Sequence, residues 1–390
     1  MSSAQFNYQR RLKKVYNLLE IKNIDYALIT NLQNLYWLTG TAQYGMLLIG
    51  KNENTQLFVR RNFFKAQKEA HIEDIIELKS TSQVSDYLHN MHANLEKLTI
   101  GMELDSLPAS FYLYYKNLLK GADLKNIELS LRKLRMVKDE KELQLMRRAA
   151  KTAQKAQETI PPLLKPGTSE NEIAAEVMRT AIKNESTHFS NVNSTFGRNW
   201  FIIASGKNLW VPSSFPVLSG DGFSNAIPYG YTNRNLKKQD ILMCDYAVNY
   251  KGYHADHART YFVGEPPKYF KERYLILKTV YQKVIDEYLR EGTTVNLLYD
   301  KMKDLLEKED LGKYFEGDGY YYQGLGHGIG LELDEPPAIL SKNTTELKEN
   351  MVVALEPKII IPEWGAIDLE DDFIIKKNGY EKITHTEYLF

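Results

Sequence analysis

Two apolar-rich runs, ILMCDYAVNY and YHADHARTYF, restrict the fold of this chain more than any other feature. Only Lys251-Gly252 separates them, and a two-residue turn between alternating runs is typical of a β-hairpin. With that turn, Asp245 lies opposite Ala258. Asp256, two positions from Ala258, then shares the face of Asp245, and diagonal neighbours on one face lie about 7–8 Å apart. The sequence therefore predicts two carboxylates on one face of a hairpin.

These two carboxylates indicate a cation site. Like charges that point into one space repel each other, so burial of both requires a cation between them. The alternative is a solvated hairpin whose acids lie on the surface, and the hairpin alone does not exclude it.

Composition and patterning divide the chain in two. Its 390 residues, 43% of them hydrophobic, are enough for two domains with sizeable cores. In residues 1–135, helical stretches alternate with short apolar runs, which predicts a small α/β domain with strands at 26–30, 45–50, 55–59 and 98–102. A long amphipathic helix, opened by Lys138-Asp139-Glu140 and closed by Pro161-Pro162, begins a second domain over residues 136–390.

Charge and cysteine content exclude several classes of protein. Fifty basic and fifty acidic residues leave no net charge to recruit nucleic acid or an anionic membrane. We find neither a signal peptide nor an apolar run near the roughly 18 residues of a membrane span, so we expect a cytoplasmic protein. The single cysteine, Cys244, excludes an intrachain disulfide and a cysteine-rich zinc module, and its apolar neighbours favour a core position.

Two further segments place polar residues in unusual surroundings. In GLGHGIGLELDEPP, glycines flank His327 and allow close backbone approach, which favours an imidazole presented at a site, although a lone histidine is more often structural. In MVVALEPKIIIPEWGAIDLEDDFIIKK, Glu356 and Glu370 interrupt strand-like runs, where glutamate is unfavourable without a partner. Singly, each is an edge-strand acid. Together with the hairpin aspartates, they form an oxygen-rich set with one nitrogen, which suits two divalent ions.

These motifs resemble the pita-bread metalloenzymes, which comprise methionine aminopeptidase, Xaa-Pro aminopeptidase, prolidase and the non-peptidase creatinase. LRMVKDEKEL, KPGTSENEIA and CDYAVNYKGYHADHART are similar to the start of the family's catalytic domain, its next helix and its paired-aspartate hairpin, and GLGHGIG, ALEP and DLEDD to its other ligand motifs. The resemblance spans most of the chain. It implies an α+β fold, with a small α/β creatinase/prolidase-like domain (1–135) before a pita-bread catalytic domain (136–390), an arrangement that excludes methionine aminopeptidase as the closest relative.

The resemblance also implies a ligand set and its metals. Two divalent ions, of manganese, cobalt, iron or zinc, would be bound by Asp245, Asp256, His327, Glu356 and Glu370. A donor set rich in carboxylates with one imidazole does not discriminate strongly among these metals.

The residues around the ligands depart from the family pattern. Pro228 and Tyr229 stand where the peptidases usually have a histidine upstream of the first aspartate ligand. Asp334 replaces a second histidine, and Asp368 replaces an arginine before the last glutamate ligand. Ala247 replaces the glycine after the first aspartate. Carboxylates in place of an imidazole and a guanidinium make the pocket more negative, which favours a cationic group or the role of a base, unless Asp334 and Asp368 only orient the ligands or lie on the surface.

We expect a metallohydrolase of the Xaa-Pro peptidase type that cleaves an amide bond in a short peptide or small molecule, with a dinuclear site that activates water and Glu356 as proton shuttle. The alternative is a pita-bread lyase or hydrolase acting on a small cationic compound, with Asp334 as base or charge partner. A metal-binding interaction module without catalysis is a third reading. The family resemblance suggests a homodimer.

Four side chains are candidates for substrate binding. Tyr229 and Asp368 stand at positions where the family pattern changes. Tyr36 and Trp37, with Tyr44 nearby, could wall a small pocket because aromatic faces attract cations. Core packing of the N-terminal domain is at least as good an explanation of these aromatic residues.

Overall fold

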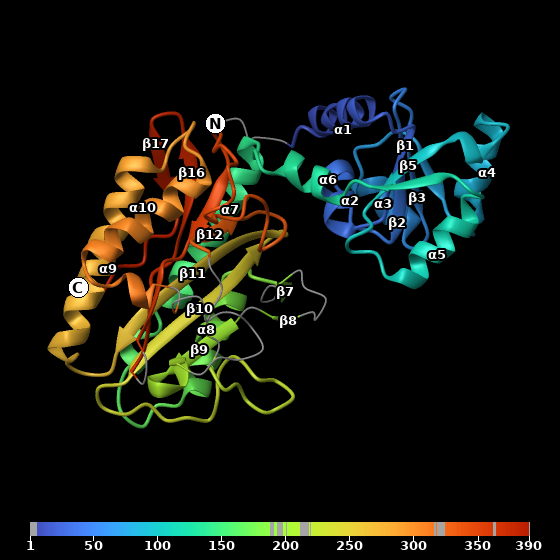
Figure 1. Cartoon of the computed structure of the whole chain (residues 1–390). Helices are drawn as coiled ribbons and strands as arrows, with labels where there is room; N and C mark the ends of the chain where they lie inside the picture. The colour runs from blue at the N-terminus through green and yellow to red at the C-terminus, as the bar shows by residue number, and fades with distance from the viewer. Residues whose placement is uncertain are drawn as a thin grey trace, which may run out of the picture. The chain divides into compact units, whose positions relative to one another are not determined.

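The computed structural model divides between Arg135 and Met136 into two compact units (Figure 1). It describes residues 6–187, 191–192, 198–199, 201–210, 218, 220–315, 317, 324–361 and 364–389. Each unit has its own sheets and its own buried core.

The N-terminal unit is built on a six-stranded mixed sheet of order β4-β3-β2-β1-β5-β6. The central strand β1 pairs antiparallel with β2 and parallel with β5. The four strands expected from the sequence are confirmed to within one residue at each end. The strands are β1 (Tyr26–Ile29), β2 (Gly45–Gly50), β3 (Thr55–Val59), β4 (Ile75–Glu77), β5 (Thr99–Met102) and β6 (Asp123–Asn126).

Amphipathic helices complete this unit. In the first helix, Leu12, Val15 and Leu19 recur at helical spacing and are buried, and the Asn7 side chain accepts a hydrogen bond from the Arg10 amide at its start. The helices are α1 (Tyr8–Lys22), α2 (Leu32–Thr39), α3 (Phe63–Glu69), α4 (Ser82–Met91), η1 (Leu95–Lys97), α5 (Ala109–Leu118) and α6 (Glu128–Arg135).

The second unit begins with two helices that pack on a three-stranded antiparallel sheet of order β11-β10-β9. Each helix starts with a capping box, Asp139 with Glu142 and Ser169 with Glu172, which satisfies amides that the helix itself leaves unpaired. Cys244 lies in the core between these layers, as its sequence context predicts. The elements are α7 (Glu140–Gln157), η2 (Pro161–Leu163), α8 (Glu170–Lys183), β7 (Asn191–Val192), β8 (Arg198–Asn199), β9 (Phe201–Ser205), η3 (Gly206–Trp210), β10 (Ile241–Tyr250) and β11 (Tyr253–Phe262).

The second unit also contains a four-stranded sheet of order β12-β13-β16-β17 and a two-stranded ribbon, β14-β15. Helices α9 and α10 pack against each other beside these strands (Figure 1). The Tyr281 hydroxyl of α9 donates to the Leu355 carbonyl at 2.8 Å, which ties the helix to the sheet. The elements are α9 (Lys268–Tyr288), α10 (Val295–Lys308), η4 (Gly312–Tyr314), β12 (Gly326–Gly328), β13 (Val352–Leu355), β14 (Lys358–Ile361), β15 (Gly365–Asp368), β16 (Asp371–Lys376) and β17 (Gly379–Lys382).

A buried ion pair joins β11 to β16. The Arg259 guanidinium contacts Asp371 at 2.7 Å, and both side chains are at most 1% exposed. Burial alone would raise the pKa of Asp371, but the cations of Arg259 and Lys382 lower it to about 2. Arg259 also donates to the Glu370 carbonyl at 2.7 Å. The residue expected to be the last metal ligand is thereby held against β11.

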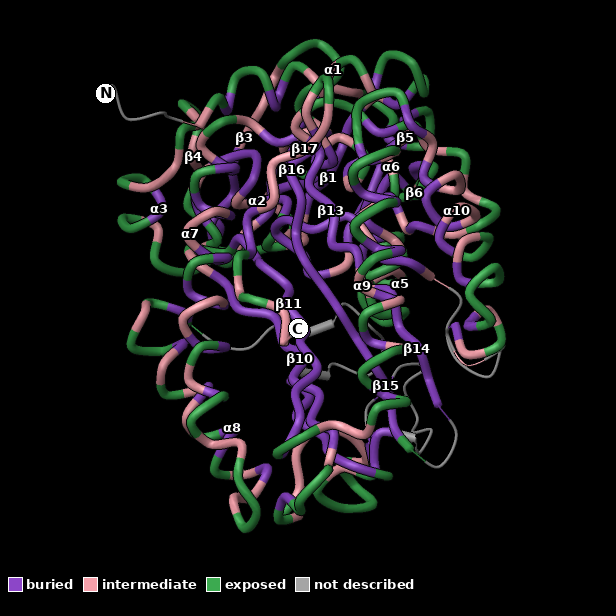
Figure 2. The backbone as a smooth tube through the Cα atoms, turned by 90° about the vertical axis from the view of Figure 1, so that its left-hand side faces the viewer, coloured by how far each residue is buried: buried purple, intermediate pink, exposed green. Residues whose placement is uncertain are grey.

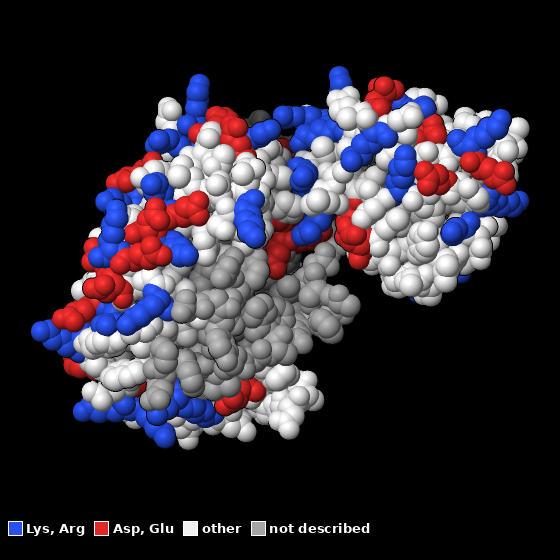
Figure 3. All heavy atoms as spheres, in the orientation of Figure 1, with Lys and Arg blue, Asp and Glu red and all other residues white. Residues whose placement is uncertain are grey.

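The surface agrees with the balanced composition. On the face shown in Figure 3, blue basic and red acidic side chains are interspersed over the described parts of both units. Figure 2 shows β10 and β11 buried along almost their whole length. Among the described helices, none is both long and apolar enough to cross a bilayer.

Replacement of Arg259 by methionine should lower the free energy of unfolding by about 3–5 kcal/mol, because loss of one partner leaves the other ion buried and poorly compensated. Urea denaturation at pH 7 measures this change. Arg148→Met is the matched control, since Arg148 and Glu185 form an exposed pair that contributes about 0–1 kcal/mol. Equal losses in the two variants would contradict the structural role given to Arg259.

Candidate metal centre

The β10–β11 hairpin presents Asp245 and Asp256 on one face. The register is the one that the sequence predicts, with Asp245 opposite Ala258 and Ala247 opposite Asp256. Lys251 and Gly252 form the turn with φ of 51° and 87°, the left-handed geometry that matches the twist of two paired strands. Both aspartates are at most 2% exposed, so the alternative of surface acids is wrong.

The short strand β12 presents His327 to the same region. A side chain at Gly326 or Gly328 would collide with backbone oxygens, since an added Cβ would lie 2.0 Å from Ala354 O or 2.3 Å from Pro336 O. These glycines therefore permit the close packing of β12. The Nδ1 of His327 lies 3.0 Å from the Gly328 carbonyl, to which it can only donate. The other ring nitrogen, Nε2, is then the one that could bind a metal after giving up its proton.

Glu356 and Glu370 lie next to the ends of two paired strands, β13 and β16. Glu356 comes directly after β13, and Glu370 lies between β15 and β16. The Glu370 amide donates to the Ala258 carbonyl at 3.1 Å. Its carboxylate is buried, and neither oxygen has a hydrogen-bond partner within the described part of the structure. A buried carboxylate in this state is strongly unfavourable unless a cation is beside it.

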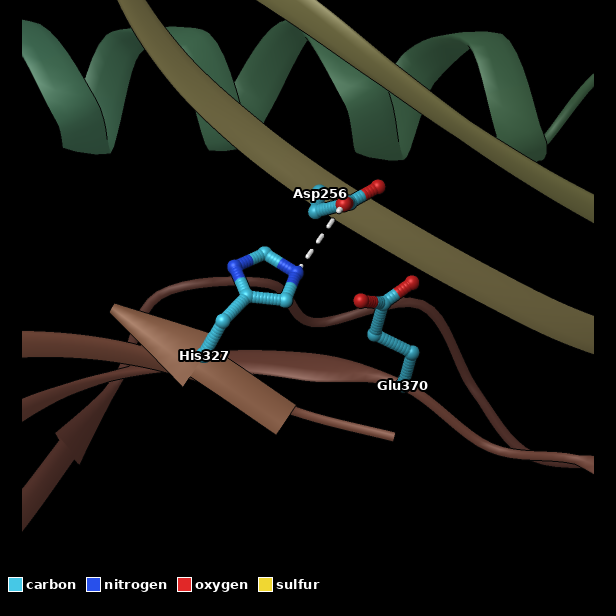
Figure 4. A group of neighbouring side chains, drawn as sticks. All are labelled: Asp256, His327 and Glu370. Carbon is cyan, nitrogen blue, oxygen red and sulfur yellow. Dashed lines mark ion pairs between the residues drawn. The ribbon is translucent and has the colours of Figure 1, made fainter. Parts of the chain in front are cut away.

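Three of these side chains converge closely enough to hold one ion (Figure 4). Asp256, His327 and Glu370 each offer a ligand atom, and these atoms lie within 4.8 Å of one another. Figure 4 shows the three side chains pointing toward one space, and the dashed line joins His327 Nε2 to Asp256 Oδ2 at 3.8 Å. Glu356 Oε1 is 3.9 Å from the same nitrogen. Two carboxylates and one imidazole are donors that fit a divalent cation.

The electrostatics of the cluster also favour a cation. Burial, followed by the charges of Asp245, Asp372 and Glu356, raises the pKa of Asp256 well above its usual range. Burial and the neighbouring carboxylates raise the pKa of Glu370 in the same way. A divalent cation would stabilise both groups in the ionised form that metal ligands need.

Asp334 lies at the exposed edge of this cluster. Its Oδ1 is 3.2 Å from His327 Nε2, and its side chain is 48% exposed. A buried ion pair between Lys138 and Glu335, 3.1 Å long, holds the adjacent segment. The carboxylate that replaces the family's second histidine therefore lies beside the imidazole and reaches solvent, where it could meet a substrate.

Asp368 is fully buried on β15, and its partner was missed in the sequence. Lys358 lies opposite it on β14, with 3.6 Å between Lys358 Nζ and Asp368 Oδ2. Lys358 also makes a short contact with Glu356. Burial lowers the pKa of Lys358, but the carboxylates of Asp368 and Glu356, with those of Asp245 and Glu370, outweigh it and raise the pKa well above its usual value. The run PKIII could have indicated this pairing, because a lysine within an apolar strand is expected to be buried and lysine is rarely buried unless it is paired.

The three aromatic candidates lie on two different segments of the chain. Tyr229 is half-buried in the loop that leads to β10. Trp37 is 1% exposed and packs in the N-terminal unit, where the Arg11 guanidinium lies 5.4 Å from its ring centroid. Tyr36 is half-buried in the same helix, α2. Because Trp37 is buried, core packing explains this residue better than a substrate pocket does.

The fold and the site together define a class, the pita-bread metallohydrolases. Residues 144–377 match the profile of Metallopeptidase family M24, and residues 11–137 match that of the Creatinase/Prolidase N-terminal domain. The chain belongs to metallopeptidase family M24. The α+β fold expected from the sequence, with its creatinase/prolidase-like N-terminal domain, is confirmed, and family membership implies divalent metal ions.

Relatives with known names are similar over nearly the whole chain. The Xaa-Pro dipeptidase of Pyrococcus horikoshii is 26% identical over 380 residues, which cover 97% of this chain and 97% of that protein. The crystal structure of the prolidase from Pyrococcus horikoshii OT3 matches with a TM-score of 0.82 and 26% identity, over 97% of this chain and 99% of the other. The Xaa-Pro dipeptidase from Bacillus anthracis matches with a TM-score of 0.84 and 26% identity, over 98% and 99%.

Replacement of Asp256 by asparagine or of Glu370 by glutamine should abolish tight metal binding and lower activity by at least about 10²-fold, because each change removes an ionised ligand. Elemental analysis of the purified variants measures bound metal, and circular dichroism checks the fold. Glu381→Gln is the control, since Glu381 of β17 pairs with Arg147 of α7, and this variant should keep its metal. Unchanged metal in both ligand variants would refute the assignment.

Proposed function

We propose that this metallohydrolase cleaves the amide bond of short Xaa-Pro peptides. The convergence of Asp256, His327 and Glu370 within 4.8 Å carries the proposal. The relatives named as Xaa-Pro dipeptidases, similar over nearly their whole length, support the substrate class. When bound, a divalent metal polarises a carbonyl group and makes water more acidic.

The side chains around the ligands would supply proton transfer and charge. Glu356 is the proposed proton shuttle, because its carboxylate lies in the cluster and its side chain is 15% exposed, which leaves it accessible to a water molecule. Lys358 holds one oxygen of Glu356 and limits its rotation. Asp334, at the exposed edge, would contact the part of the substrate that lies nearest to His327.

A second candidate function is favoured by the position of Asp334. Its exposed carboxylate, in place of a histidine, makes the mouth of the site more negative than the family pattern does. Such a site suits a small cationic compound, on which the enzyme would act as a lyase or hydrolase with Asp334 as base or charge partner.

The cytoplasmic location and the homodimer stay predictions. Light scattering of the purified protein tests the homodimer.

Two variants of Asp334 separate these functions. In the peptidase, Asp334→His moves toward the family pattern and should preserve or improve cleavage of a Xaa-Pro dipeptide, whereas Asp334→Asn should change kcat/KM by less than about tenfold. In an enzyme for a cationic compound, Asp334→Asn should lower kcat/KM by about 10²- to 10⁴-fold, because a positioned acid–base group is lost.

The measurement is kcat/KM for each variant on Xaa-Pro dipeptides, longer Xaa-Pro peptides and quaternary-ammonium or sulfonium compounds. Asp304→Asn, an exposed change on α10, is the control and should leave every rate unchanged. Turnover of a cationic compound without any peptide cleavage would refute the peptidase proposal, and efficient peptide cleavage that survives Asp334→Asn would refute the second function.

A further inference from the structure

A lysine side chain lies inside the carboxylate cluster. Lys358 is 7% exposed, although lysine is rarely buried without a partner. Its ammonium contacts Glu356, one of the five expected ligands, and lies 3.6 Å from Asp368. The cluster therefore already contains one positive charge that belongs to the protein.

Strand pairing fixes the backbone that carries Lys358. Lys358 and Asp368 are Cα partners in the β14–β15 ribbon. The Asp368 amide donates to Thr260 Oγ1 at 2.8 Å, and the same hydroxyl donates to the Asp368 carbonyl at 3.0 Å. The ribbon is thereby anchored to β11, the strand that carries Asp256. Lys358 therefore lies on a ribbon that is hydrogen-bonded to the strand carrying Asp256.

The ligand atoms converge at one point. Within the described residues, the potential ligand atoms that come within 4.8 Å of one another belong to Asp256, His327 and Glu370. The two other expected ligands, Asp245 and Glu356, are not in this group, and Glu356 is the one that the Lys358 ammonium contacts. A second divalent ion that shared Glu356 would enter the field of that ammonium, and like charges at short range in a buried site repel strongly.

We propose that this centre binds a single divalent ion, on Asp256, His327 and Glu370, and that the Lys358 ammonium serves as the second cation of the cluster. The proposal rests on the metallopeptidase assignment and replaces the pair of ions that the family resemblance implies. Lys358 neutralises Asp368 and Glu356, so these two carboxylates are compensated without a second ion. Unlike a metal ion, the ammonium is covalently tethered and stays when chelators remove the metal.

The number of metal ions per chain tests this directly. Metal-depleted protein is equilibrated with excess MnCl₂, desalted and measured by elemental analysis against protein concentration. The unmodified enzyme should retain one manganese per chain. Lys358→Met keeps most of the side-chain volume but removes the charge, and should retain two. Lys358→Arg keeps the charge and should retain one.

Two further variants keep the test decisive if Lys358→Met does not fold. Lys382→Met removes another lysine paired with a buried carboxylate, Asp371, and should still bind one ion. Asp245→Asn should also bind one ion, because the single ion does not depend on Asp245. Two ions in the unmodified enzyme, a loss of metal in Asp245→Asn, or one ion in a folded Lys358→Met would each overturn the proposal. Peptide cleavage is assayed separately, so an enzyme with one ion and no peptidase activity refutes the proposed function alone.

Discussion

The register between β10 and β11 is the constraint on which the site depends, because a strand slipped by one residue turns all its side chains to the other face. The left-handed turn at Lys251 and Gly252 sets that register, and ten residue pairs follow from it. Asp245 and Asp256 then point into the same space. The other proposed ligands can form a site only where this hairpin places its two aspartates.

Buried charge holds the remaining segments to the hairpin. Arg259 on β11 binds Asp371 and the Glu370 carbonyl, so the strand that carries one ligand also positions another. Arg259, Lys382 and Lys358 lower the cost of burying so many carboxylates, and the divalent metal that family membership implies would lower it further. The contacts that compensate the buried carboxylates therefore also position the strands that carry the ligands.

The residues around the ligands depart from the family pattern. Asp334 and Asp368 both replace basic or neutral groups of that pattern, but they differ in burial and in their partners. Asp368 is buried and paired with Lys358 across a strand ribbon, which removes it from contact with substrate. Asp334 stays half-exposed beside His327 and can act on a bound molecule. We therefore propose that the specificity of the site depends on Asp334 more than on Asp368.

The sequence by itself determined the hairpin and its register, and its resemblance to a metalloenzyme family indicated the identity and order of the proposed ligands. The hairpin rests on local rules, because side chains alternate along a strand and a lysine-glycine turn favours one geometry. Four of the six strands of the N-terminal unit were predicted to within one residue at each end for the same reason, whereas β4 and β6 were not predicted.

Only the tertiary structure decided which charges meet. The pairing of Lys358 with Asp368, the approach of Asp334 to His327 and the contact of Arg259 with Asp371 join different segments of the second unit. The sequence likewise did not decide whether Trp37 lines a pocket or packs in a core, and its burial and its contact with Arg11 place it in the core. Such contacts depend on how strands and loops pack in three dimensions, and side-chain periodicity along a single segment contains no information about its partners in another.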